Sequence, residues 1–90
     1  MSRYVAVYDI SDGRRRERVS RILLSFGYRV QLSVFEIWLE PEEVRELRRD
    51  VGPHLDDDDR FDLFPIDERG NRQTISWQRQ LDGFDPVRLL

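Results

Sequence analysis

Apolar and polar positions alternate along the chain in a pattern that divides its first 66 residues into six elements. Residues 3–10 are nearly all apolar or aromatic, which predicts a central strand with both faces covered or in contact. In residues 13–26, apolar side chains recur at helical spacing and arginines take the opposite face, which predicts an amphipathic helix. We expect Ser11 or Asp12 to cap the start of this helix and Gly27 to end it.

The alternation changes phase within residues 28–40, which otherwise have the composition of a β region. The apolar positions are even-numbered up to Val34 and odd-numbered from Phe35 onward. One flat strand cannot bury both sets on a single face. Either a tight connection near residues 31–33 makes two strands, or a bulge reorients one strand.

The next segment begins with Pro41 and two glutamates, which favour the first turn of a second helix. This helix should run to about Asp50, and a loop containing the aspartate run 56–59 should lead to a strand over residues 60–66. The order strand, helix, strand, strand, helix, strand predicts an α+β, ferredoxin-like βαββαβ domain over residues 1–66.

Residues 67–90 form an extension for which this six-element plan has no place. A Glu-Arg-Gly-Asn turn signal precedes residues 73–78, which have strand character and contain Ile75 and Trp77. These apolar side chains need burial, as do Leu81 and Phe84 farther along. We therefore predict an extra C-terminal strand that pairs with the sheet of a partner protomer.

Size and composition narrow the class of protein. Ninety residues are close to the size at which a single core is marginal, so we expect an oligomer. With 39% hydrophobic and 37% charged residues and no long apolar run, the chain predicts no membrane span. The absence of a recognisable targeting signal before the first strand favours the cytoplasm. Without cysteine and with one histidine, His54, the chain excludes disulfides, zinc-thiolate sites, thiol nucleophiles and a histidine triad.

Charge is distributed unevenly along the chain. The net charge of −3 argues weakly against a general nucleic-acid binder, but all fifteen basic residues are arginine. Five of them crowd one segment: Arg14, Arg15, Arg16, Arg18 and Arg21. The guanidinium group favours bidentate phosphate contacts, although a genome rich in arginine codons also explains the lack of lysine. Cations at a helix start are disfavoured by about 0.3–1 kcal/mol each, so another interaction should favour them there.

Asp9 ends the apolar strand beside this arginine block, an arrangement that suits phosphate and metal. Magnesium usually takes one or two carboxylates plus waters, so Asp9 alone is a poor catalytic set. The alternative is that Asp9 hydrogen-bonds the following turn, as aspartates commonly do.

Three pieces of the sequence are distinctive in combination. They are the strand that ends in Tyr-Asp (within residues 4–12), the arginine-led helix (residues 14–24) and the Arg-x-Gln-x-Ser-Val-Phe-Glu segment (residues 29–36). Together they resemble the CRISPR-associated endoribonuclease family, the small second protein of the CRISPR adaptation machinery. The likeness is clear over the first half of the chain and follows the order of elements to about residue 66.

The resemblance implies a ferredoxin-like homodimer in which the Asp9 carboxylates of two protomers face each other and bind a divalent metal, Mg²⁺ or Mn²⁺. It also implies metal-dependent cleavage of RNA or duplex DNA, partnership with the CRISPR integrase in spacer integration, and a tail strand on the other protomer's sheet. One alternative is a non-catalytic scaffold that holds duplex DNA between integrase dimers. A regulatory small-ligand module on the same fold is another.

On this basis Asp9 is the candidate catalytic and metal-binding residue. The candidate nucleic-acid contacts are Arg14, Arg15, Arg16, Arg18, Arg21 and Arg29, and the candidate dimer contacts are Tyr8, Phe35, Ile75 and Trp77. Gln31 and Ser33 are expected to shape the same cleft as Arg29.

Several of these residues have a plainer interpretation as well. Arg18 and Arg21 could form a solvated face, with Glu17 paired to Arg21, and Phe35 could pack in the core. We interpret His54 and the aspartate run as parts of a solvated loop.

Overall fold

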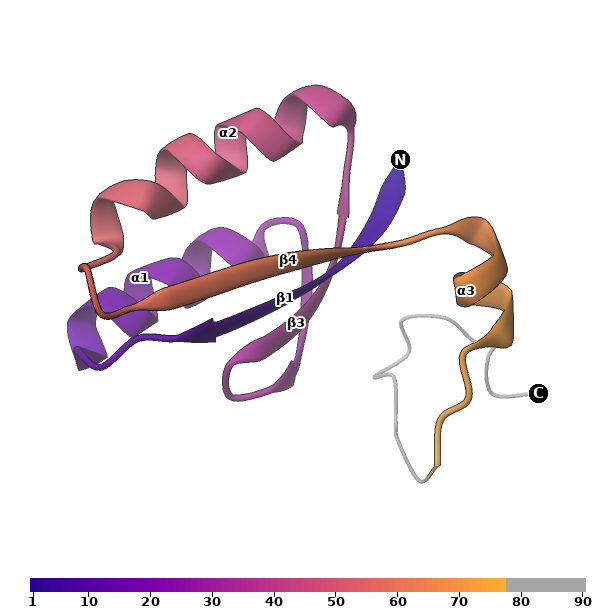
Figure 1. The fold of residues 1–90 in the computed structure, drawn as a ribbon, viewed down its shortest axis with the longest axis horizontal. Helices are drawn as coiled ribbons and strands as arrows, with labels where there is room; N and C mark the ends of the chain where they lie inside the picture. The colour runs from indigo at the N-terminus through magenta and orange to yellow at the C-terminus, as the bar shows by residue number, and fades with distance from the viewer. Residues whose placement is uncertain (78–90) are drawn as a thin grey trace.

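A four-stranded antiparallel sheet forms the frame of the protein in the computed structural model, which describes residues 1–77 (Figure 1). The elements are β1 (Ser2–Asp9), α1 (Gly13–Leu24), β2 (Gly27–Gln31), β3 (Val34–Leu39), α2 (Pro41–Val51), the 3₁₀ turn η1 (Gly52–His54), β4 (Arg60–Ile66) and α3 (Glu68–Gln73). The strand order β2-β3-β1-β4 places β1 centrally, as the sequence predicted. The predicted α+β, ferredoxin-like plan is confirmed.

The core lies between the sheet and one layer formed by α1 and α2. Strand residues of one parity, such as Ala6 and Phe35, are fully buried against helix residues such as Val19 and Leu47. The buried apolar set is Ala6, Tyr8, Ile10, Val19, Leu23, Phe35, Ile37, Leu39, Leu47 and Val51. Because side chains alternate along a strand, this packing buries one of the two faces of the sheet.

The opposite face of the sheet carries the alternate residues of the same strands. Val5 and Val7 of β1 lie beside Val34 of β3 and Phe64 of β4 by strand register, and none of the four belongs to the core. The Phe64 side chain is 52% exposed. We call this surface the open face.

The phase change between residues 28 and 40 corresponds to a hairpin with an irregular register. β2 pairs with β3, and the register shifts between Arg29 and Gln31. A tight turn over residues 32–33 joins the two strands. The two features that the sequence left as alternatives, a turn and a bulge, are therefore both present.

The prediction that Gly27 ends the first helix was wrong. α1 ends at Leu24 with Ser25 as its C-cap, and Gly27 is the first residue of β2. A Cβ at Gly27 would clash with the backbone carbonyl oxygen of Glu36 and lie 2.7 Å from the Cα of Ile37. Glycine is needed here because β3 approaches the backbone closely, not because the helix must stop.

The extension begins with a short helix where the sequence predicted a turn. Asp67 caps α3, since its side chain accepts a hydrogen bond of 2.7 Å from the Gly70 amide. The strand predicted over residues 73–78 is not formed in its described part, because Gln73 ends α3 and residues 74–77 are neither helix nor strand. A strand requires a neighbouring edge for its backbone hydrogen bonds, so pairing with a partner protomer stays a prediction.

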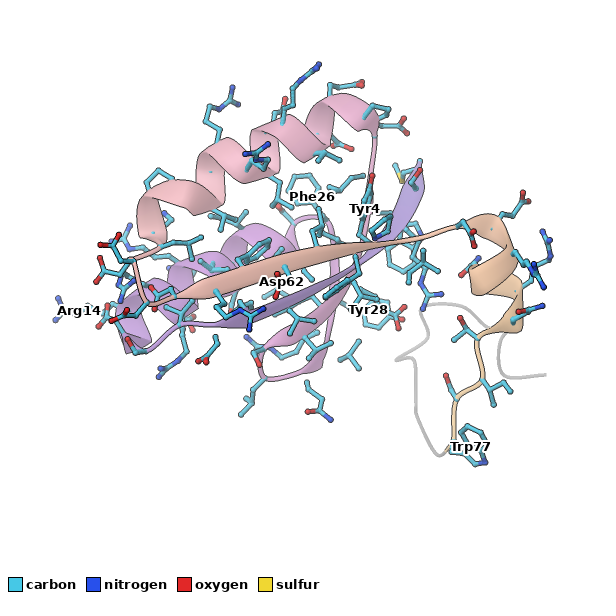
Figure 2. The ribbon with its side chains drawn as sticks, in the orientation of Figure 1. Tyr4, Arg14, Phe26, Tyr28, Asp62 and Trp77 are labelled. Carbon is cyan, nitrogen blue, oxygen red and sulfur yellow. The ribbon has the colours of Figure 1, made fainter. Side chains whose placement is uncertain are left out.

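The apolar side chains of this extension are not buried within the protomer. Ile75 and Trp77 are 71% and 78% exposed, and Figure 2 shows Trp77 pointing away from the sheet. Residues 78, 81 and 84, which the same prediction included, lie outside the described part of the chain. None of the helices within residues 1–77 is long and apolar enough to cross a membrane.

Candidate functional site

Asp9 is the last residue of β1 and lies at the end of the open face. It shares the parity of Val5 and Val7, its side chain is exposed, and Arg60 of β4 lies opposite it in the register. Arg60 forms an ion pair of 3.4 Å with Asp62 of its own strand. Within residues 1–77 no group hydrogen-bonds or forms an ion pair with the Asp9 carboxylate, so its oxygens are available to a ligand.

The turn that follows Asp9 takes its hydrogen bonds from other aspartates. Asp12 caps α1 by accepting from the Arg15 amide at 3.3 Å, and Asp59 accepts from the Ser11 amide at 3.3 Å. The alternative in which Asp9 stabilises this turn is therefore not what the structure shows. Of the two predicted caps for α1, Asp12 is confirmed.

An open hollow of about 530 Å³ lies between the end of β1, the start of α1 and the turn between β2 and β3. Its charged and polar lining comes from Asp9, Arg16, Glu17, Ser20, Arg29 and Ser33. We call it the Asp9 hollow. The Tyr8 amide donates to the Ser33 carbonyl at 3.1 Å, which holds the β2–β3 turn against β1. The structure thus brings Asp9, Arg29 and Ser33 together as predicted, whereas Gln31 is exposed and does not line the hollow.

A chain of hydrogen bonds supports one wall of the Asp9 hollow. Arg29 Nη2 donates to Ser20 Oγ at 2.9 Å, Ser20 Oγ and the Tyr8 hydroxyl are 2.7 Å apart, and Tyr8 donates to the Leu32 carbonyl at 3.2 Å. One direction satisfies every group: Arg29 to Ser20, Ser20 to Tyr8, Tyr8 to Leu32. Sequence reasoning missed Ser20, although it follows the buried Val19 and is itself buried.

Two predicted dimer contacts lie in the protomer's own core. Tyr8 is 4% exposed and Phe35 is fully buried, with their rings 6.1 Å apart. The Arg29 guanidinium lies over the Phe35 ring at 5.1 Å from its centre. Phe35 therefore takes the core role that the sequence left open, and both rings offer little surface to a partner chain.

Arg15 points away from Asp9 and into a group of aspartates. Its Nη1 bonds to the Asp59 carboxylate and donates to the His54 carbonyl at 3.1 Å. Its Nε lies 3.4 Å from Asp12 and its Nη2 lies 3.6 Å from Asp56. The hydrogen bond with Asp59 is the main cause of a raised pKa for the Arg15 guanidinium. The structure therefore uses this guanidinium to join α1 to the loop after α2.

The aspartate run is not a uniformly solvated loop, which corrects our interpretation of it. The Asp59 side chain is 2% exposed, whereas that of Asp56 is 82% exposed. A hydrogen bond from the Asp56 amide, followed by those from Arg15 and the Ser11 amide, holds the pKa of the Asp59 carboxyl below its usual range. A local signal for this role was its place directly before β4, whose first residue pairs with Asp9 in the register.

Arg16 also makes contacts within the protein. Its Nη1 donates to the carbonyls of Ile10 and Ser11 at 3.0 and 2.9 Å. These bonds, together with the ion pairs of Arg15, offset the unfavourable placement of cations at the start of α1. The position of Arg15 and Arg16 in the first turn is thus explained by the fold itself.

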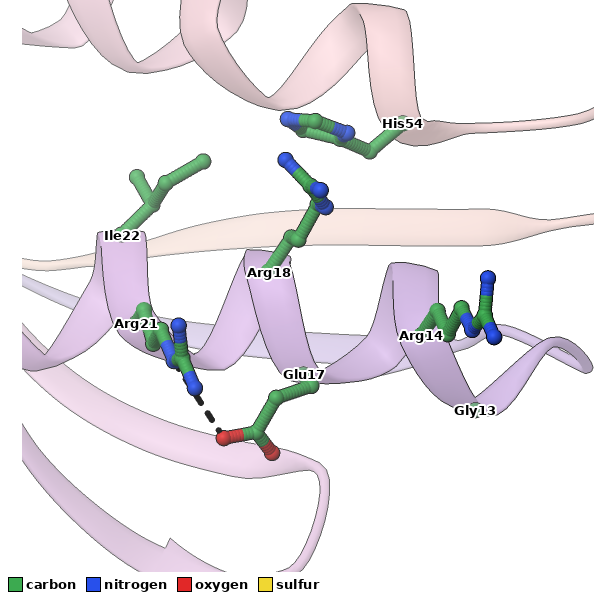
Figure 3. A pocket seen from close by; sticks show the side chains of 7 residues that line it. All are labelled: Gly13, Arg14, Glu17, Arg18, Arg21, Ile22 and His54. Atoms are coloured by element: carbon green, nitrogen blue, oxygen red, sulfur yellow. Dashed lines mark ion pairs between the residues drawn. The ribbon is translucent and has the colours of Figure 1, made fainter.

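A second open groove, of about 560 Å³, runs along the outer side of α1 (Figure 3). It is lined by Gly13, Arg14, Glu17, Arg18, Arg21, Ile22 and His54. We call it the Arg18 groove. Figure 3 shows Arg18 extending toward the His54 ring, so this histidine, which we interpreted as part of a solvated loop, lies beside the arginines of α1.

The arginines of the Arg18 groove differ in their partners. Arg21 Nε lies 3.4 Å from Glu17 Oε1, which is the i, i+4 pair that the sequence offered as an alternative. Arg14 and Arg18 are exposed, and no hydrogen bond or ion pair within residues 1–77 engages their guanidinium groups; Figure 2 shows Arg14 directed outward. These two are the α1 arginines best placed to meet a ligand from solution.

Residues 1–77 of one protomer do not by themselves provide a metal-binding cluster. Within the described residues no three His, Cys, Asp or Glu side chains are grouped so that they could hold a metal ion. The open carboxylate of Asp9 has the right chemistry for Mg²⁺ or Mn²⁺, but it fits such an ion only if a second set of oxygen ligands is supplied from outside the protomer.

Comparisons with known proteins agree on one family. The family model described as CRISPR associated protein Cas2 matches residues 1–74. The CRISPR-associated endonuclease Cas2 2 of Thermus thermophilus is 41% identical over 64 residues, which are 70% of this chain and 71% of that protein. The CRISPR-associated endoribonuclease Cas2 3 of Synechocystis sp. is 33% identical over 75 residues, which are 82% of each protein.

A solved structure extends the comparison to three dimensions. A chain in a partial Cas6-RT-Cas1–Cas2 complex superposes with a TM-score of 0.70 at 24% identity, over 84% of this chain and 90% of that one. At this identity the likeness concerns the fold, which agrees with the sheet order described above.

Proposed function

Because the chain belongs to the CRISPR associated protein Cas2 family, we propose that it is a metal-dependent endonuclease of CRISPR adaptation that works as a homodimer with the CRISPR integrase. The resemblance inferred from three sequence segments is confirmed by the family match. The names of two relatives, an endonuclease and an endoribonuclease, support nuclease activity. The observation that carries the proposal is the exposed, unpaired Asp9 carboxylate at the end of the central strand and of the open face.

The homodimer that we propose forms through the open face. A two-fold contact buries the same patch on both protomers, so the half-buried Val5 and Val34 and the exposed Phe64 would be covered by their equivalents. Asp9 ends the same face and would approach the partner's Asp9, giving two carboxylates at one site. The exposed side chain of Trp77 would gain cover from the partner's sheet edge.

The catalytic role of Asp9 follows from this pairing. The Asp9 carboxylates of the two protomers would hold a divalent ion, which would supply charge neutralisation at the scissile phosphate and activation of a water. Asp9 would thereby set the place where the phosphate must lie. Arg29, held by Ser20 at the wall of the Asp9 hollow, provides a fixed positive charge beside that place.

The nucleic-acid backbone, in this proposal, runs along the Arg18 groove. Arg14 and Arg18 have free guanidinium groups and would contact phosphates, with Arg21 available after its weak exposed pair with Glu17 opens. Arg15 and Arg16 contribute through the shape of the α1 start, because Arg15 is bound to Asp59 and Arg16 Nη1 donates to the carbonyls of Ile10 and Ser11. RNA and duplex DNA both present such a backbone, so the groove suits either substrate.

A non-catalytic scaffold is the second candidate function. The observation that favours it is that Asp9 belongs to no group of three possible metal ligands within the described residues, whereas several arginines of α1 are exposed. In the solved complex a chain of this fold is present together with Cas1, which supports partnership with the CRISPR integrase in either case.

The test is incubation of the purified protein with labelled RNA and labelled duplex DNA, with and without Mg²⁺, beside Asp9→Asn. We expect the substitution to abolish Mg²⁺-dependent cleavage while duplex binding and the dimer persist. Asp62→Asn is the matched control, since it removes a partly exposed carboxylate two pairs farther along the same face. Unchanged cleavage by Asp9→Asn would reject the proposed site, and duplex binding without any cleavage by the wild type would favour the scaffold.

A further inference from the structure

Asp59 lies where the loop after α2 meets the turn that follows Asp9. Its Oδ1 accepts from the Ser11 amide at 3.3 Å, and its Oδ2 accepts from the Asp56 amide at 2.8 Å and bonds to Arg15. With 2% of its side chain exposed, it is the buried member of an otherwise solvated run. One carboxylate therefore contacts three separate segments: the β1–α1 turn, helix α1 and the α2–β4 loop.

The turn is held from the helix side as well. Arg16 donates to the carbonyls of Ile10 and Ser11, so the peptide units directly after Asp9 are bonded on two sides. On the other side of Asp9, β1 is fixed between its neighbouring strands. The Asp9 carboxylate thus projects from a short segment whose two ends are both anchored.

We propose that Asp59 is a positioning residue, which through Ser11 and Arg15 fixes the β1–α1 turn and with it the direction of the Asp9 carboxylate. This inference rests on the proposed function of Asp9. In Asp59→Asn one carboxylate oxygen becomes an NH2 group that cannot accept, so either the Ser11 amide or the Arg15 guanidinium loses its acceptor and the turn shifts. A displacement of about 1 Å at a reacting group can lower a rate about 100-fold.

Asp59 differs in this role from the other aspartates beside Arg15. Asp12 and Asp56 also lie beside Arg15, but at 3.4 and 3.6 Å, and their side chains are 48% and 82% exposed. Neither contacts the amide of Ser11. The charge around Arg15 is therefore shared, whereas the link to the turn after Asp9 is made by Asp59.

The experiment compares Asp59→Asn with Asp58→Asn. Both variants remove one negative charge from the same loop, but Asp58 is exposed and makes no hydrogen bond or ion pair through its side chain within the described residues. The measurements are hydrogen exchange of the Ser11 amide by NMR, and kcat and KM on the nucleic acid that the wild type cleaves. We expect Asp59→Asn to speed Ser11 exchange about tenfold or more and to lower kcat about 10- to 100-fold with KM within about twofold.

Equal Ser11 exchange in the two variants would overturn the link to the turn, and faster exchange with an unchanged kcat would overturn the positioning role. If Asp59→Asn does not fold, Arg15→Lys and Arg15→Gln replace it, since lysine keeps the cation beside Asp59 and should retain more of the rate. If the wild type shows no Asp9-dependent cleavage, the proposed function fails, while Ser11 exchange still decides whether Asp59 holds the turn.

Discussion

Arg3 of β1 and Glu36 of β3 form a buried ion pair on the same face of the sheet as Val5, with 2.8 Å between Arg3 Nη2 and Glu36 Oε2 and only 6% and 3% of the side chains exposed. The Tyr28 hydroxyl donates to the same carboxylate at 2.8 Å. Arg3 Nη1 donates to Asn71 Oδ1 of α3 at 2.6 Å. The pair therefore ties three strands to the start of the C-terminal extension.

Removing the cation of this pair should destabilise the protein strongly. Arg3→Met takes away the positive charge beside a buried carboxylate, which typically costs about 3–5 kcal/mol in the free energy of unfolding. Urea denaturation measures this change. Arg60→Met is the matched control, because its exposed pair with Asp62 should contribute less than about 1 kcal/mol. Equal losses in the two variants would contradict the importance of burial at Arg3.

The two free arginines of the Arg18 groove should dominate the salt dependence of duplex binding. Replacing Arg14 and Arg18 by glutamine should weaken binding and reduce the slope of log affinity against log salt by about one unit per lost phosphate contact. The control replaces Arg45 and Arg49, which are exposed on α2, and should change the slope less. Fluorescence anisotropy over a salt series gives both slopes. If the α2 variant shows the larger change, the duplex lies on the other helix.

Gly27 should not tolerate a methyl group. The Cβ of Gly27→Ala would meet the Glu36 carbonyl and the Ile37 backbone, which must shift, at a cost of about 1–3 kcal/mol or more. Gly52→Ala is the matched control, since no atom lies within 4 Å of its added Cβ and its φ of −49° suits alanine. Thermal unfolding should give a clearly lower midpoint for Gly27→Ala and a similar or higher one for Gly52→Ala.

Acid should weaken the protein partly through Asp59. Its pKa is lowered in the folded state, first by the hydrogen bond from the Asp56 amide and then by Arg15, so the stability that it contributes is present above about pH 4, the usual value of an unfolded aspartate. That contribution is lost as the pH falls through the lowered folded pKa. The free energy of unfolding, measured from pH 7 to pH 2.5, should therefore fall less steeply in Asp59→Asn than in the wild type. Asp58→Asn should follow the wild type, and a flattened curve for that variant would assign the effect to charge alone.

The C-terminal extension should strengthen the dimer. Deleting residues from Asp67 onward should weaken the dimer and lower the thermal midpoint, and Trp77→Ala should do so more mildly, because buried aromatics anchor interfaces. Deletion from Ile75 onward keeps the hydrogen bond between Arg3 and Asn71, so it isolates the contribution of residues 75–90 to the dimer. Sedimentation measures the association.

The control for this prediction is Leu24→Ala, which trims an exposed apolar side chain on α1. It should leave the dimer unchanged. If the chain without residues 75–90 were as dimeric and as heat-resistant as the full chain, the extension would have no part in the dimer.

Elements with a local signal could be predicted from the sequence alone. β4 spans the predicted residues 60–66, and α2 starts at Pro41 as expected. Hydrophobic periodicity reports burial directly, since a strand alternates with period two and a helix with period 3.6. The place of Asp9 at the end of a central strand followed from the same pattern.

Other features depended on contacts between residues distant in the sequence. Gly27 is needed because of Glu36, and α3, with six residues, is too short to show a helical period. In the sequence the arginines of α1 all looked like candidate phosphate contacts, yet their roles in the structure differ because their neighbours differ. Arg15 reaches Asp59, 44 residues away, while Arg18 faces solvent. No local pattern encodes which carboxylate a guanidinium will meet, because that pairing arises only when the α2–β4 loop folds back against the start of α1.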